Sequence, residues 1–162
     1  MNDAHLHLIL VHIPIILVPL GAILLSIGMF KQNITLKLTS FYVFAVASIF
    51  AIAAFLLGEG AEEIVEDIAG ISESLIEAHE ESGEIALWAT AILGVLSLVN
   101  ILSQKLNLKF AHPLMIVTLI VSIFSSGALA YTGQEGGKIR HPEAFDPSAL
   151  SGNSDKNDAD ND

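Results

Sequence analysis

The chain of 162 residues contains no cysteine, which excludes disulfides, thiolate metal sites, iron–sulfur clusters, thiol nucleophiles and c-type haem attachment. Positive charge is scarce: 7 Lys and Arg stand against 18 Asp and Glu, and the net charge of −11 argues against nucleic acid as a partner. Charged residues make up only 15% of the chain, whereas soluble domains contain about 25%. With 52% hydrophobic residues, the composition indicates a small membrane protein.

Four stretches without a charged residue cover residues 6–30, 38–58, 85–103 and 110–131. Each is close to the ~20 residues that a helix needs to cross a hydrocarbon core of ~30 Å. Helices are expected because lipid cannot satisfy backbone polar groups, and the period-two alternation of a β-barrel is missing. The predicted fold is all-α, a transmembrane four-helix bundle of two hairpins within residues 1–145. The acidic tail, residues 146–162, is predicted to be disordered.

The distribution of lysine predicts the orientation in the membrane. The connection between the third and fourth spans and the one between the first two spans are short and basic, whereas residues 59–84 contain ten acidic residues and no basic one. The positive-inside rule places the basic connections in the cytoplasm and both termini outside. Residues 59–84 also carry apolar residues three and four apart, which predicts an amphipathic helix on the outer face, and the stretch from Ser72 can continue into the third span.

Two histidines are the leading candidates for a site. His12 lies about 6 Å inside the outer end of the first span, and ionisable residues within a membrane usually face the bundle interior. His79 continues an apolar stripe four residues after Leu75, with Gly83 a further four residues along. Each also has an ordinary explanation as an interfacial histidine that hydrogen-bonds a carbonyl or reaches toward water.

Imidazoles from two helices of a bundle can bind the iron of haem b from both sides, so His12 and His79 are the predicted axial ligands. Lys138 and Arg140, the basic residues expected just outside the last span, suit the haem propionates. His141 is a second-choice ligand. The segment TGQEGG is interpreted as a turn in which Gly136 and Gly137 allow close approach of a cofactor.

Two other functions remain open. His5 and His7 form an H-L-H pair that could contribute to a Cu or Zn site on the outer face. Alternatively, the chain is a cofactor-free structural or assembly subunit whose acidic outer helix binds a partner protein. No G-x-S-x-G, H-E-x-x-H, P-loop or G-x-G-x-x-G motif is present, so catalysis by the chain alone is not expected.

Four motifs of the chain are distinctive: LVHIPIIL at 10–17, LLGEGAEE at 56–63, EAHEESGEIAL at 77–87 and YTGQEGGKIRH at 131–141. In these motifs the chain resembles an uncharacterised family of small bacterial four-span membrane proteins. The resemblance implies a four-span protein of the bacterial inner membrane and a link to electron transfer, because relatives are often joined to cytochrome domains. Expected partners are the lipid bilayer, a quinone or redox protein, and a second copy of the chain. The positions that it singles out are His12, Pro14, His79, Thr132, Gly133, Gly136, Gly137 and His141.

Overall fold

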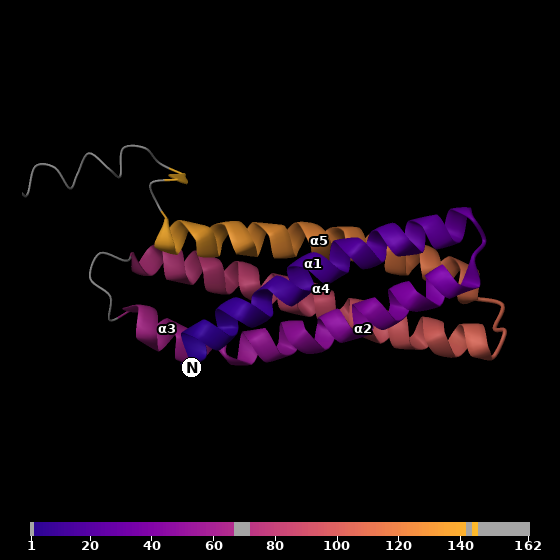
Figure 1. The fold of residues 1–162 in the computed structure, drawn as a ribbon, viewed down its shortest axis with the longest axis horizontal. Coiled ribbons are helices and arrows are strands. Elements are labelled where there is room, and N and C mark those ends of the chain that lie inside the picture. The colour runs from indigo at the N-terminus through magenta and orange to yellow at the C-terminus, as the bar shows by residue number, and fades with distance from the viewer. Residues whose placement is uncertain (1, 67–71, 142–143, 146–162) are drawn as a thin grey trace, which may run out of the picture.

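The computed structural model describes residues 2–66, 72–141 and 144–145, without the side chains of Val65, Glu66 and Arg140. These residues form helices and no strand, and the helices lie side by side along one axis (Figure 1). The predicted all-α fold is therefore confirmed. The helices are α1 (Asp3–Phe30), α2 (Ile34–Leu56), α3 (Gly58–Glu66), α4 (Glu73–Lys105) and α5 (Ala111–Arg140).

Local signals in the sequence explain where the helices begin and end. The side chain of Asn2 accepts a hydrogen bond from the His5 amide, and that of Asn33 accepts one from Leu36, so both asparagines cap helix N-termini. The short connections after α1 and α4 each contain one residue in the left-handed conformation, Gln32 and Asn107, both with φ of 51°. This conformation ends a helix and lets the chain reverse within a few residues.

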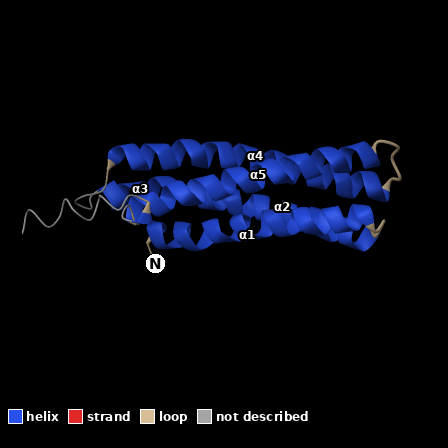
Figure 2. Ribbon diagram, turned by 90° about the horizontal axis from the view of Figure 1, so that it is seen from above, coloured by secondary structure: helices blue, strands red, loops and turns tan. Residues whose placement is uncertain are grey.

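Four helices are long and apolar enough to cross a membrane: α1, α4, α5 and the continuous segment of α2 and α3 up to Ile64. α1 packs against α2 and α5, and α4 packs against the same two helices. α1 and α4 are therefore diagonal partners, and Figure 2 shows them at opposite edges of the bundle. α3 packs on α1 and α2. It begins at Gly58, directly after Leu57, which is the C-cap residue of α2.

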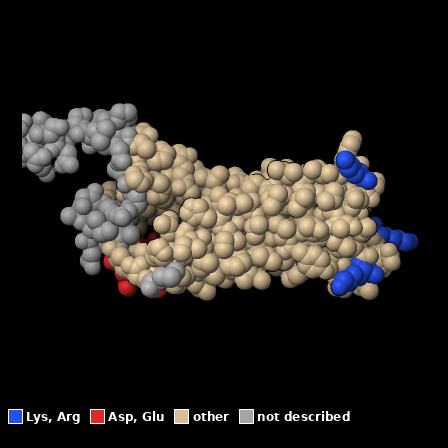
Figure 3. Space-filling model, viewed as in Figure 1, with Lys and Arg blue, Asp and Glu red and all other residues tan. Residues whose placement is uncertain are grey.

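The two ends of the bundle carry opposite charge (Figure 3). The connections α1–α2 and α4–α5 form one end, called the lysine end, which carries Lys31, Lys37, Lys105 and Lys109. The start of α1, α3, the start of α4 and the end of α5 form the other, called the acidic end. This separation is what the lysine distribution along the sequence predicts for two membrane hairpins.

Buried residues recur at alternating spacings of three and four along every long helix, and each such line is called a seam. This heptad spacing is typical of helices that pack along a bundle axis. Small and polar side chains dominate the seams, as expected where helices associate in lipid by close approach rather than by hydrophobic burial. The buried seam residues are Pro14, Val18, Gly21, Leu25 and Gly28 in α1; Lys37, Ser40, Phe44, Ala47, Ala51 and Ala54 in α2; Ala86, Thr90, Leu93, Ser97 and Asn100 in α4; and Met115, Thr118, Ser122, Ser125 and Leu129 in α5.

A fully buried hydrogen bond joins the seams of α4 and α5 in the interior of the bundle. The Asn100 side-chain nitrogen donates to the Thr118 hydroxyl at 2.7 Å, and both residues are fully buried. We expect the variants Asn100→Ala and Thr118→Ala to be coupled by about 0.6 kcal/mol and at most about 1.7 kcal/mol, the range for such bonds between membrane helices. A double-mutant cycle on the free energy of unfolding in detergent measures this coupling, and strictly additive losses would contradict it.

Candidate functional site

At the acidic end the seams of α1 and α4 each terminate in a histidine. His7 lies one heptad before Pro14, and His79 lies one heptad before Ala86. Their ring centroids are 6.3 Å apart and the ring planes differ by 83°. Because α1 and α4 are diagonal, the two imidazoles meet across the centre of the bundle rather than along the surface of one helix pair.

Each imidazole is held by a backbone carbonyl from a neighbouring helix. Nδ1 of His7 lies 2.8 Å from the Ala54 carbonyl oxygen, and Nδ1 of His79 lies 3.0 Å from that of Thr132. A carbonyl oxygen can only accept, so Nδ1 carries the proton in both rings. In the neutral form, Nε2 then has a free lone pair, which is the arrangement usual for histidines that bind a metal ion.

Glycines occupy the corresponding positions on the other diagonal. The seam of α2 continues to Gly58 at the start of α3, and the seam of α5 continues to Gly136. A Cβ atom at Gly136 would lie 3.0 Å from Cε1 of His79, and one at Gly58 would lie 3.8 Å from Cε1 of His7. The four seams therefore end in two histidines and two glycines, with the glycines next to the rings.

An ion pair lies beside this layer on α5. Nζ of Lys138 is 2.7 Å from Oε1 of Glu135, and the Glu135 side chain is 4% exposed. Glu135 directly precedes Gly136 and follows Thr132 by three residues, so it belongs to the same turn that contacts His79. A carboxylate that is so little exposed needs a cationic partner. The ion pair therefore also engages the ammonium group of Lys138.

The structure does not bring the predicted pair of His12 and His79 together. His12 is exposed, and its Nδ1 bonds to the Leu8 carbonyl of its own helix at 2.6 Å. Its depth in the uncharged stretch was informative about membrane position, but rotation of α1 turns it away from the seam. His7, which was predicted only as part of the alternative Cu or Zn site with His5, lies opposite His79 instead. The expectation that His79 faces the bundle agrees with its half-buried ring.

The other predicted site residues are only partly brought together. His5 is exposed and lies on a different face of α1 from His7, because residues two apart in a helix point in different directions. His141 is exposed at the end of α5, and the side chain of Arg140 lies outside the described part of the chain. TGQEGG is not a turn, because α5 continues through it to Arg140. Helical continuation places Gly136 against His79 and Gly137 against the ring of Phe145.

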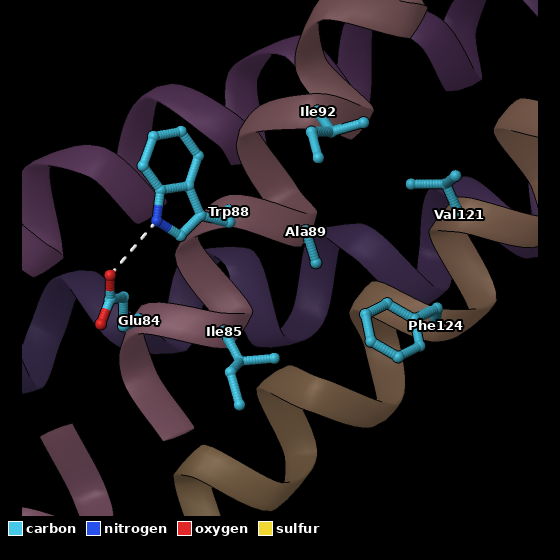
Figure 4. A pocket seen from close by; sticks show the side chains of 7 residues that line it. All are labelled: Glu84, Ile85, Trp88, Ala89, Ile92, Val121 and Phe124. Atoms are coloured by element: carbon cyan, nitrogen blue, oxygen red, sulfur yellow. Dashed lines mark hydrogen bonds between the residues drawn. The ribbon is translucent and has the colours of Figure 1, made fainter. Parts of the chain in front are cut away.

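Within the described ranges, no group of three or more His, Asp and Glu side chains is suited to hold a metal ion. A separate groove of about 470 Å³ runs over the outer surface of α4 and α5 (Figure 4). Trp88 and Phe124 line it, and Nε1 of Trp88 donates to Glu84 at 3.4 Å. Its lining is almost entirely apolar, as expected of a surface that faces lipid tails, and it does not include the histidines.

Comparison with known proteins identifies the family. A family model described as "Predicted membrane protein (DUF2231)" matches residues 4–142, which cover all four long helices. No curated protein matches the chain. No solved structure matches it either. Because the match covers most of the chain, the protein belongs to the DUF2231 family of predicted membrane proteins.

Proposed function

We propose that the protein is a b-type haem-binding subunit for electron transfer, with His7 and His79 as the axial ligands. The observation that carries the proposal is the meeting of two imidazoles from diagonal helices, each with Nδ1 bonded to a carbonyl. Haem iron takes two axial ligands from the protein, so a pair of histidines suffices. Bound haem would supply a one-electron couple at this end of the bundle.

The separation of the rings supports coordination of one ion between them. A metal–imidazole bond is about 2.0–2.1 Å long, so two imidazoles that bind one ion from opposite sides have ring centres roughly 6 Å apart. The ring centroids of His7 and His79 are 6.3 Å apart. Coordination through Nε2 also leaves both carbonyl bonds at Nδ1 in place, so that Ala54 and Thr132 fix the orientation of the ligands.

The glycines support a flat ligand in particular. A planar macrocycle between the histidines must extend toward the other two helices, and Gly58 and Gly136 are the residues of those helices that lie beside the rings. Any side chain at these positions would occupy that space. Lys138 and Arg140 follow Gly136 within about one turn and remain the proposed partners of the propionates. For Lys138 this would require the ammonium group to exchange its ion pair with Glu135.

The acidic end lies on the outer side of the membrane in this proposal, since the positive-inside rule assigns the lysine end to the cytoplasm. The haem would then exchange electrons between a membrane donor, such as a quinone, and an acceptor outside. The Cu or Zn site at His5 and His7 is less well supported, because His5 points away from the bundle.

The test is an optical spectrum of detergent-purified protein from cells supplied with haem, first oxidised by air and then reduced with dithionite. We expect sharp α and β bands on reduction and about one haem per chain. His7→Ala and His79→Ala should each lose the haem, because one axial ligand is missing. His12→Ala and His5→Ala are matched controls from the exposed face of α1 and should keep it.

A featureless spectrum from folded parent protein would contradict the proposal and favour a structural subunit. Stoichiometric copper or zinc that disappears in the double variant His5→Ala and His7→Ala would instead favour the metal site. Haem that survives in His7→Ala, but is lost in both His12→Ala and His79→Ala, would instead favour His12 and His79 as the ligands.

A further inference from the structure

Lys37 is a buried cation at the opposite end of the bundle from the histidines. It lies on the seam of α2, and the whole residue is only 8% exposed. Its stem packs against α1, where a Cβ atom at Gly28 would lie 3.1 Å from Cγ of Lys37. Its ammonium group donates to the side-chain oxygen of Gln32 at 3.3 Å, a neutral partner that does not balance the charge.

No carboxylate in the described part of the chain lies near this charge. Residues 4–58 and 85–134 contain no Asp or Glu, so the described acidic side chains lie at the opposite end of the bundle. Removing an ammonium group from water is costly unless it is paired with an opposite charge. Since no described side chain supplies an anion, the position of Lys37 suits one from outside the bundle.

The surroundings of Lys37 suit an anion that is attached to lipid. Lys31, Lys105 and Lys109 belong to the same end, and Lys37 itself lies in the first turn of α2, where helix amide groups favour negative charge. Next to these charges the apolar side chains of Phe30 and Ile34 are exposed, with 89% and 50% of their surface accessible. A phosphate beside exposed apolar groups is the chemistry of a phospholipid.

We propose that Lys37 binds the phosphate of an anionic phospholipid in the leaflet at the lysine end, with the acyl chains against Phe30 and Ile34. Free phosphate shares the charged group but cannot use the apolar side chains. The proposal is independent of haem binding, because it concerns the other end of the bundle. Lys37 thereby becomes a lipid-specific contact rather than a general part of the positive charge that orients the hairpins.

The experiment measures thermal unfolding in a neutral detergent through the fluorescence of Trp88, the single tryptophan. Phosphatidylglycerol should raise the unfolding temperature of the parent in a saturable manner, since a ligand that binds only the folded state stabilises it. Phosphatidylcholine and inorganic phosphate should have much smaller effects. In Lys37→Met the apparent affinity for phosphatidylglycerol should fall about tenfold or more, because a charge-assisted hydrogen bond is lost.

Lys31→Met is the matched control, because Lys31 is an exposed lysine at the same end of the bundle and its loss should change the affinity only slightly. Lys37→Arg should retain binding, since it keeps a cation on a long stem. An unchanged response to phosphatidylglycerol in Lys37→Met would overturn the proposal, as would equal losses in Lys37→Met and Lys31→Met. A response to inorganic phosphate as large as that to the lipid would overturn the phospholipid as the ligand.

Discussion

A Gly136→Leu variant will fold like the parent but bind haem about ten- to a hundredfold more weakly. A Cβ atom at this position already lies 3.0 Å from Cε1 and 3.3 Å from Nδ1 of His79, so the larger side chain must displace the ring. Displacement also breaks the bond from Nδ1 to the Thr132 carbonyl. Overpacking costs about 1–3 kcal/mol, which corresponds to the stated loss of affinity at ~1.4 kcal/mol per factor of ten.

Haem titration of protein purified without haem, followed in the optical spectrum, measures this affinity. Gly127→Leu is the matched control, because Gly127 lies in the same helix and its Cβ would meet no atom within 4 Å. The control should bind haem like the parent. Equal affinities for Gly136→Leu and Gly127→Leu would show that haem, if bound, does not lie beside His79.

A Gly28→Val variant will be less stable by about 1–3 kcal/mol without a change in the histidine pair. A Cβ atom at Gly28 would lie 2.9 Å from the backbone nitrogen of Lys37, and backbone cannot move aside as a flexible side chain can. The ends of α1 and α2 would have to separate, and the short connection at Gln32 limits that movement.

The free energy of unfolding in detergent, monitored by helical circular dichroism or Trp88 fluorescence, measures the effect of Gly28→Val. Gly127→Val is again the control, since it introduces the same β-branched residue into a helix at an open position. If both variants lose the same stability, the loss comes from helix propensity rather than from contact between α1 and α2. Haem content per folded chain should stay at the level of the parent.

The fold was predictable because the membrane imposes strong requirements on a sequence. Uncharged stretches long enough to span a membrane identify the helices. Lys31 and Lys105 identify the helix ends of α1 and α4 that lie together at the lysine end. The long helix that begins after Ser72 was also predictable, because Ser72 is a suitable N-cap residue ahead of the third span. These features depend on composition along the chain and not on the rotation of each helix.

The site depends on the rotation of each helix, and this rotation is why the structure places His7, and not His12, opposite His79. A histidine deep in an uncharged stretch attracts attention, yet depth does not determine which face of the helix carries it. The heptad line from Leu25 through Val18 and Pro14 leads to His7 and excludes His12. That signal was present in the sequence. Its meaning became clear only when the buried residues defined the seam of α1.

The segment around Gly136 shows a different limit. Glycines in TGQEGG favour a turn by local propensity, but α5 continues because its neighbours supply contacts that local propensity does not include. Gly136 packs against His79, which is 57 residues away in the sequence. Long-range contacts of this kind cannot be derived from the spacing within one segment.

The diagonal arrangement of α1 and α4 has a consequence for biogenesis. Each histidine belongs to a different hairpin, since His7 lies on α1 and His79 on α4. Either hairpin can enter the membrane by itself, but neither contains both imidazoles. The two histidines can therefore meet only when the hairpins associate. A group bound by both histidines would hold together two hairpins that insert independently. Its presence would therefore indicate that the bundle is fully assembled.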